Sequence, residues 1–194
     1  MQDIWYGDNR DLVKWGTLVH LATREHLGLI VQVALFRKGK PITLKTGLET
    51  VPVPANVWSH FRKLGNIQSL CESPGPEMLV FADEFDHNTR RSYFQRVAEV
   101  LRQRNEAKAV LLDPDTGLKL TKYNAKHVIP PDILETWEAL RKGDWLLLYQ
   151  HRWFSTRWRV IARQRFKTAC GALKVETFRA TKQPSDVILL GARK

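Results

Sequence analysis

Short apolar runs rich in β-branched residues alternate along this chain with longer segments of helical periodicity, and this alternation constrains the fold most. Asp8–Leu27 carries apolar residues three to five apart and stops at Gly28, which predicts a helix. Leu29–Phe36, directly after it, predicts a buried strand. The same reasoning predicts further strands at Met78–Ala82, Ala109–Leu112 and Trp145–Tyr149, and further helices at Thr89–Arg104, Pro131–Arg141 and Ser155–Cys170.

The order of these elements predicts an α/β fold with a mainly parallel sheet flanked by helices. Two final β-type runs, Leu173–Phe178 and Asp186–Leu190, predict an antiparallel strand pair at the end of the chain. A length of 194 residues suits a single domain spanning residues 1–194.

The charge balance is strongly basic, with 31 Lys and Arg against 20 Asp and Glu and a net charge of +11. Such an excess favours polyanionic partners, nucleic acid (RNA or DNA) first and an acidic membrane surface second, although it can also serve solubility alone. Two cysteines are too few for a disulfide framework, and the start of the chain resembles no signal peptide. No apolar stretch is long enough to span a membrane, so we expect a cytoplasmic protein.

The loop DPDTG at residues 113–117 follows the apolar run AVLL, at a strand end where open α/β sheets bind ligands. Asp113 and Asp115 could accept hydrogen bonds from an amino group, act as a general base, or hold Mg²⁺ or Mn²⁺. The alternative is that these residue types only form a turn.

The segment YQHR at residues 149–152 follows the strand WLLLY and should open at the same edge of the sheet. Tyr149 could stack on a base, His151 could transfer a proton or bind a metal, and Arg152 could hold a phosphate. The alternative is a structural histidine.

A charged segment surrounds the start of the first predicted helix, where Asp8 or Asn9 could be its N-cap. Asp11 and Lys14 stand three residues apart, on one helical face. They are either a surface ion pair or two residues of a site.

Between His151 and Lys182 the sequence holds nine Lys and Arg residues and one acid, Glu176, with aromatic residues among them. A basic face attracts phosphates and exposed aromatics stack on unpaired bases, although most of these aromatics are better explained as core residues. The nucleic-acid contacts predicted here are Arg152, Arg157, Arg163, Arg165 and Lys167.

The signatures GxxxxGK[ST], HExxH, GxSxG and GxGxxG are missing from the sequence, and so are paired CxxC motifs. With these residues in view, the chain resembles, over nearly its full length, a group of uncharacterised bacterial and phage proteins. That group shares a GDxxDLxK start, a DPD[TN]G loop and a YQH strand end. More distantly, the chain is similar to the ribosomal RNA adenine N6-methyltransferases, on the spacing Gly7-x3-Asp11-x2-Lys14 and the Asp-Pro loop.

The methyltransferase resemblance implies a Rossmann-like fold that binds S-adenosylmethionine and methylates a base. Asp113 would lie against the target amino group, while Gly7, Asp11 and Lys14 would lie near the cofactor. Asp83 or Glu84, acidic residues at a strand end, could bind the cofactor's ribose. Thr116 stands where the family's DPPY loop has an aromatic residue.

Two other hypotheses remain open on the sequence. In a metal-dependent nuclease, Asp113 and Asp115, with Asp11, would bind Mg²⁺ or Mn²⁺ while His151 assists proton transfer. In a non-catalytic protein, an enzyme scaffold would serve only to bind nucleic acid or another partner.

Overall fold

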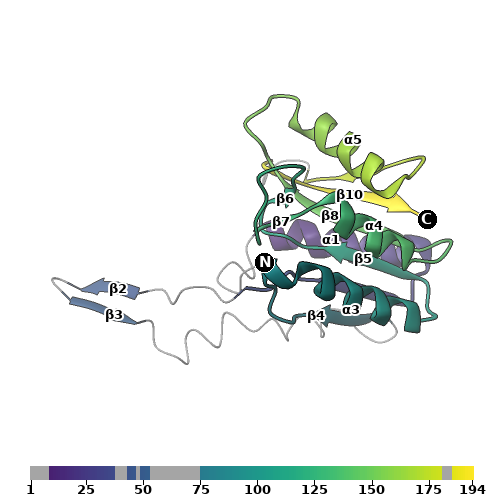
Figure 1. Ribbon diagram of the computed structural model, residues 1–194, viewed down its shortest axis with the longest axis horizontal. Helices are drawn as coiled ribbons and strands as arrows, with labels where there is room; N and C mark the ends of the chain where they lie inside the picture. The colour runs from purple at the N-terminus through teal and green to yellow at the C-terminus, as the bar shows by residue number, and fades with distance from the viewer. Residues whose placement is uncertain (1–8, 38–42, 47–48, 53–74, 181–184) are drawn as a thin grey trace.

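The computed structural model describes residues 9–37, 43–46, 49–52, 75–180 and 185–194, and its centre is a six-stranded sheet (Figure 1). The helices are α1 (Asn9–Glu25), α3 (Arg90–Gln103), α4 (Pro130–Glu138) and α5 (Trp158–Cys170), with a 3₁₀ helix η3 (His87–Thr89). The sheet contains β1 (Leu29–Val33), β4 (Glu77–Phe81), β5 (Lys108–Leu112), β8 (Trp145–His151), β9 (Glu176–Phe178) and β10 (Val187–Arg193).

The sheet has the strand order β4-β1-β5-β8-β10-β9. The first four strands are mutually parallel, while β10 runs antiparallel to both β8 and β9. From β1 the chain passes to β4 on one side and then returns to β5 on the other. The strand order therefore reverses between β1 and β5, and in open α/β sheets the crevice beyond such a reversal is where ligands bind.

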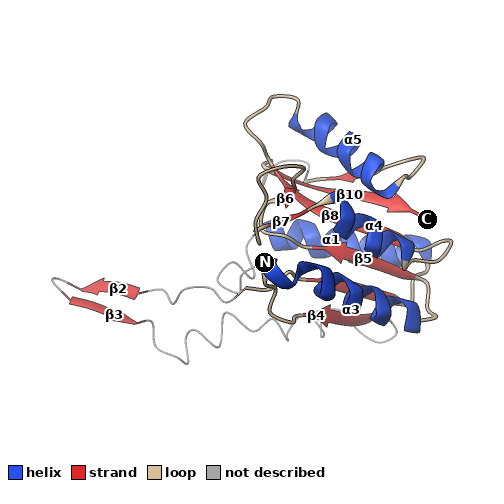
Figure 2. Cartoon of the chain, in the orientation of Figure 1, coloured by secondary structure: helices blue, strands red, loops and turns tan. Residues whose placement is uncertain are grey.

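Helices cover both faces of this sheet (Figure 2). α1 packs on one face, over alternate strand residues that include Ile30, Leu111 and Leu147. α3, α4 and α5 pack on the other face, over the intervening residues, such as Val31 and Val110. The inner strands β1, β5, β8 and β10 are buried on both sides, which is why they read as largely continuous apolar runs rather than as an alternating pattern.

The predicted α/β class, the mainly parallel sheet and the C-terminal antiparallel pair are confirmed. Element ends differ by a few residues. α1 ends at Glu25 rather than Leu27, because His26 adopts the left-handed conformation with φ 53°. α5 begins at Trp158 rather than Ser155, because the Ser155 hydroxyl and carbonyl accept hydrogen bonds from the next turn.

Some short elements were not predicted from the sequence. β6 (Gly117–Leu118) and β7 (His127–Val128) form a two-residue parallel pair, too short to give a periodic signal. β2 (Thr43–Thr46) and β3 (Glu49–Pro52) form a separate antiparallel hairpin. Among the described residues, no helix has both the length and the apolar character that a membrane span requires.

Candidate functional site

Polar side chains replace apolar ones at the carboxyl end of the sheet, on the face that α1 covers. Successive side chains of a strand point to opposite faces, so Gln32 continues the row of Ile30, and Asp113 continues the row of Leu111. The two rows are neighbours, because β1 pairs with β5 and the Asp113 amide donates to the Val33 carbonyl at 3.0 Å. This polar end of the core coincides with the reversal of strand order.

The buried ammonium of Lys14 joins α1 to this end of the sheet. Its Nζ lies 2.7 Å from Asp11 Oδ1 and 2.9 Å from Asp113 Oδ2, and its side chain is only 4% exposed. Burial by itself would lower the pKa of Lys14, but the charges of Asp113 and Asp11 outweigh burial and raise this pKa. Lys14 is therefore a permanent cation between two carboxylates, and the surface ion pair considered from the sequence is in fact buried.

Asp113 accepts a second hydrogen bond, from Gln32 Nε2 at 2.6 Å, and is 1% exposed. Its carboxylate thus connects β1, β5 and α1 from inside the protein. The residue predicted to contact the target directly instead lies beneath the surface, where it fixes the start of the DPDTG loop.

Asp115 lies further along the same loop and is partly exposed. It forms an ion pair with Arg37, which follows β1, so the pair bridges the two strand ends at the reversal. Burial lowers the pKa of Arg37, although a guanidinium remains charged at any ordinary pH.

The strand end of β8 lies beside the DPDTG loop, as the sequence predicted. The Lys14 ammonium lies 4.8 Å from the centre of the Tyr149 ring, and that ring meets the His151 ring edge-on at 5.0 Å. Burial lowers the pKa of His151; Asp186 opposes this shift, whereas Arg10 and Lys14 reinforce it. The imidazole is therefore neutral at pH 7, in the form that can accept a proton.

The DPDTG loop is tied to β8 through a buried glutamine. Gln150 Oε1 accepts from the Leu118 amide at 2.9 Å, and Gln150 Nε2 donates to the Thr116 carbonyl at 3.1 Å. Gly117 lies against this side chain with φ 110°, and a Cβ at residue 117 would come within 2.4 Å of the Gln150 amide group. Only glycine fits this close approach.

Gly117→Ala should therefore lower the free energy of unfolding by about 1–3 kcal/mol, through backbone strain and displacement of the Gln150 amide. Urea denaturation measures the change. Gly143→Ala is the control, because Gly143 also has a positive φ but nothing lies within 4 Å of its Cβ position. Equal losses in the two variants would mean that the contact with Gln150 has no energetic effect beyond the positive φ.

An open pocket of about 620 Å³ lies beside the Asp115–Arg37 pair, beyond the carboxyl ends of β1 and β4. Glu84, which pairs with Phe36 in an isolated bridge, supplies an exposed carboxylate there. The lining residues are Arg37, Glu84, Phe85, Asp86, His87, Thr89 and Ala125. The pocket thus combines apolar surface with carboxylates at the place where this fold binds ligands.

Arg90 supports the wall of this pocket. Its guanidinium donates to Asp132 and to the carbonyls of Asn124, at 3.1 Å, and His127, at 3.0 Å, and lies 5.0 Å from the Phe85 ring centre. It therefore connects α3, α4 and the loop that leads to β7.

The structure separates the other predicted cofactor residues. Asp83 points to Arg96 of α3, at 3.7 Å, and its neighbour Glu84 lines the pocket instead. Asp11 lies with Lys14 on the α1 face, whereas the pocket is lined from η3 and the end of β4. Gly7 is outside the described residues.

The predicted nucleic-acid contacts fall on α5 and the loop before it. Arg152 and Arg157 are exposed in that loop, and Arg163 is exposed on the helix, with its Nε bonded to the Val175 carbonyl at 3.1 Å. Arg165 lies 4.7 Å from the Trp153 ring, and Lys167 is half-buried. The buried face of α5 consists of Trp158, Ala162, Phe166 and Cys170, so two of the interleaved aromatics are core residues.

No structural role was predicted from the sequence for Gln32 or for Gln150 of the YQHR segment, although each left a signal. Gln32 lies inside the otherwise apolar strand LIVQV, Gln150 directly follows the run WLLLY, and both are completely buried. A buried amide needs hydrogen-bond partners, so a glutamine within such a strand indicates a polar network.

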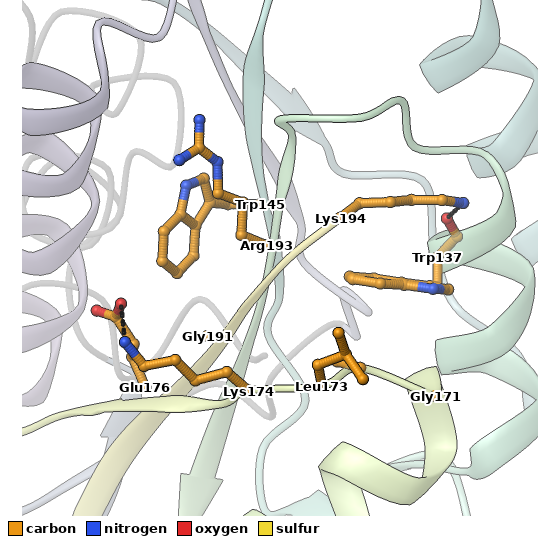
Figure 3. Close-up of a pocket in the computed structure, with 10 residues that line it drawn as sticks. Trp137, Trp145, Gly171, Leu173, Lys174, Glu176, Gly191, Arg193 and Lys194 are labelled. Atoms are coloured by element: carbon orange, nitrogen blue, oxygen red, sulfur yellow. Dashed lines mark hydrogen bonds and ion pairs between the residues drawn. The ribbon is translucent and has the colours of Figure 1, made fainter.

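A second pocket, of about 290 Å³, lies at the opposite end of the sheet, where β8 begins (Figure 3). Trp137, Trp145 and Leu173 line it together with Lys174 and Glu176, which form an ion pair at 3.8 Å. It contains none of the predicted site residues, and the amino ends of parallel strands are not where this fold class binds its ligands.

No group of three or more His, Cys, Asp or Glu residues within the described part of the chain could hold a metal ion. Of the carboxylates considered for a metal, Asp11 and Asp113 are both bound to the Lys14 ammonium.

Comparison with known proteins shows little. No protein-family model matches the sequence, and no curated protein matches it. Among solved structures, the fold is similar to a DUF574 family protein from Streptomyces avermitilis MA-4680, with 12% sequence identity and a TM-score of 0.43. The similarity covers 96% of this chain and 82% of that protein.

Proposed function

We propose that this chain is a nucleic-acid-acting enzyme that transfers a methyl group from S-adenosylmethionine to an amino group of a base. The observation that carries the proposal is the pocket beyond the carboxyl ends of β1 and β4, which is lined by the carboxylate of Glu84 and by Arg37, the ion-pair partner of Asp115 in the DPDTG loop. The net charge of +11 suits a nucleic-acid substrate.

The residues of the pocket fit the proposed cofactor. A volume of about 620 Å³ lies within the range of small-molecule sites. Glu84 follows β4, next to β1, and an acidic residue at this place in a nucleotide-binding sheet accepts hydrogen bonds from ribose hydroxyls. Phe85 and Ala125 supply apolar surface for the adenine ring. S-Adenosylmethionine, when bound, supplies an electrophilic methyl group.

The neighbouring residues suit an amino-group acceptor. Asp115 is the more exposed carboxylate of the DPDTG loop and can accept hydrogen bonds from the amino group, which leaves the nitrogen lone pair directed away from it. Asp113 and Lys14 hold the loop from below. The neutral His151 is in the correct form to receive the proton that the nitrogen loses on methylation.

Methyl transfer is favoured over metal-dependent cleavage by the position of Lys14. Its ammonium is already paired with two of the three carboxylates that the nuclease hypothesis needs, which leaves Asp115, itself paired with Arg37. A divalent cation in the same place would have to displace a buried lysine.

Isothermal titration with S-adenosylmethionine should show binding by the wild-type chain. Glu84→Ala should weaken this binding by roughly 5- to 150-fold, because removing an acceptor for a ribose hydroxyl costs about 1–3 kcal/mol. Asp83→Ala is the matched control, since the adjacent carboxylate points to Arg96 and should leave affinity unchanged. No binding by the wild type at millimolar ligand would reject the proposal.

A transfer assay tests the acceptor. With S-adenosylmethionine carrying a tritiated methyl group, the wild type should label RNA or DNA, and Asp115→Asn should reduce the rate at unchanged cofactor affinity. Cofactor binding without any transfer would leave the cofactor assignment standing and contradict the assigned acceptor.

A further inference from the structure

The loop between β8 and α5 carries a phenylalanine with its whole side chain in solvent. Phe154 is 114% exposed, the largest value among the exposed apolar residues of the described chain. A fully exposed aromatic ring gains nothing from the fold of its own chain, so the fold does not explain its presence.

This loop starts at the candidate site. The His151 amide donates to the Thr116 carbonyl of the DPDTG loop at 3.2 Å, and the Arg152 amide donates to the Asp186 carbonyl at 2.7 Å. Figure 1 shows the connection leaving the end of the sheet that also carries β6 and β7. Phe154 therefore stands three residues beyond a residue of the site, on the edge where a substrate would approach.

The surroundings of Phe154 are positively charged. Residues 152–167 contain six Lys and Arg and no Asp or Glu. Arg152 and Arg157, two residues before and three residues after Phe154 in the chain, are both exposed. The Arg165 guanidinium lies over the ring of Trp153, the residue before Phe154. Asp186, whose carbonyl accepts from the Arg152 amide, is paired through its side chain with Arg10 at 2.6 Å. An exposed ring flanked in the chain by exposed cationic side chains matches a strand whose phosphates alternate with unpaired bases.

We infer that Phe154 is a base-stacking residue, and that Arg152 and Arg157 bind the flanking phosphates of a single-stranded nucleic acid. In a duplex the base faces are covered by their neighbours, so the loop would select single strands or looped-out bases over paired ones. The inference rests on the nucleic-acid part of the proposed function and names its substrate class.

The test measures binding of fluorescent single-stranded 12-mers of deoxythymidine and uridine, and of a 12-base-pair duplex, without S-adenosylmethionine. The wild type should bind the single strands more tightly than the duplex. Phe154→Ala should weaken single-strand binding roughly 5- to 150-fold, the fold-change for loss of one stacked base, and Phe154→Trp should restore it. Since the ring contacts no core residue, the alanine variant should fold normally.

Leu173→Ala is the matched control, because Leu173 is 95% exposed but lies at the opposite end of the sheet, where Figure 3 shows it lining the second pocket. It should leave oligonucleotide binding unchanged. Replacing Arg152 and Arg157 by alanine should flatten the salt dependence of single-strand binding, by a slope of about 0.7 for each lost phosphate contact.

Wild-type affinity in Phe154→Ala would overturn the inference, and so would equal weakening in Leu173→Ala. A parallel arm uses vesicles with anionic lipid headgroups, because an exposed aromatic among arginines also suits a membrane surface. Loss of vesicle binding in Phe154→Ala with oligonucleotide binding intact would assign the loop to membranes instead. Since no arm contains the cofactor, these outcomes are independent of the titration that tests the proposed cofactor.

Discussion

Lys14→Met should lower the free energy of unfolding by about 3–5 kcal/mol. The substitution keeps most of the side-chain volume but removes the ammonium that lies between Asp11 and Asp113. Both carboxylates are buried, so the variant keeps two negative charges close together in the core without the ammonium that lay between them. The midpoint of urea denaturation at pH 7 measures the loss.

Arg10→Met is the control from the same helix. Arg10 pairs with Asp186 at 2.6 Å, but the two side chains are 39% and 37% exposed, so we expect a loss of at most about 1 kcal/mol. Adding Asp11→Asn and Asp113→Asn to Lys14→Met should recover part of the loss, because the two buried negative charges are then removed together with the ammonium. Similar losses in the two methionine variants would contradict the buried position of Lys14.

Asp144→Ala should produce a loss of similar size, about 3–5 kcal/mol, at the other end of the sheet. Asp144 accepts from Lys108 Nζ at 2.9 Å, from the Lys108 amide at 3.1 Å and from the Arg141 amide at 2.9 Å. The Lys108 side chain is completely buried, so the variant leaves an ammonium without its counter-ion and two amides without acceptors. Thermal and urea denaturation both report this loss.

Glu77→Ala is the control for Asp144→Ala. Glu77 lies at the amino end of β4 and forms an ion pair with Arg104. Because the Glu77 side chain is 54% exposed, its removal should cost at most about 1 kcal/mol. Asp144→Ala should leave S-adenosylmethionine affinity unchanged at temperatures where the variant is folded, because Asp144 lies at the amino ends of the strands. A folded Asp144→Ala protein of wild-type stability would show that Lys108 is not neutralised by this residue alone.

The two buried ion pairs discussed above hold opposite ends of the central strand β5. Lys108–Asp144 fixes the start of β5 against the turn before β8, while Lys14–Asp113 fixes the end of β5 against α1. Each fixes one end of a central strand. The polar contacts at the carboxyl end also hold the DPDTG loop, so stability and the geometry of the site share residues there.

If the non-catalytic hypothesis applied, Asp115→Asn would leave biological activity intact, while charge reversal at Arg163 and Lys167 would abolish nucleic-acid binding. The proposed function predicts loss of activity in Asp115→Asn with folding preserved. The same pair of variants therefore separates an enzyme from a binding protein on this scaffold.

The sequence by itself determined the α/β class and the order of the main elements, because apolar periodicity is a local property of each segment. It also located the DPDTG and YQHR strand ends, since polar residues directly after apolar runs mark where parallel strands leave a sheet. The ends of helices were less predictable, as His26 shows, because a non-glycine residue took the left-handed position.

Only the tertiary structure decided which of these residues meet. Lys14 and Asp113 are 99 residues apart and come together because α1 covers the face on which Gln32 and Asp113 point. No local sequence pattern determines which face of the sheet α1 covers. Nor does a local pattern determine that Glu84, rather than Asp83, lines the pocket. A buried charge is costly unless partners compensate it, and distant segments of the chain supply the partners of Asp113. The burial of Asp113 therefore could not be predicted before the arrangement of the strands and α1 was known.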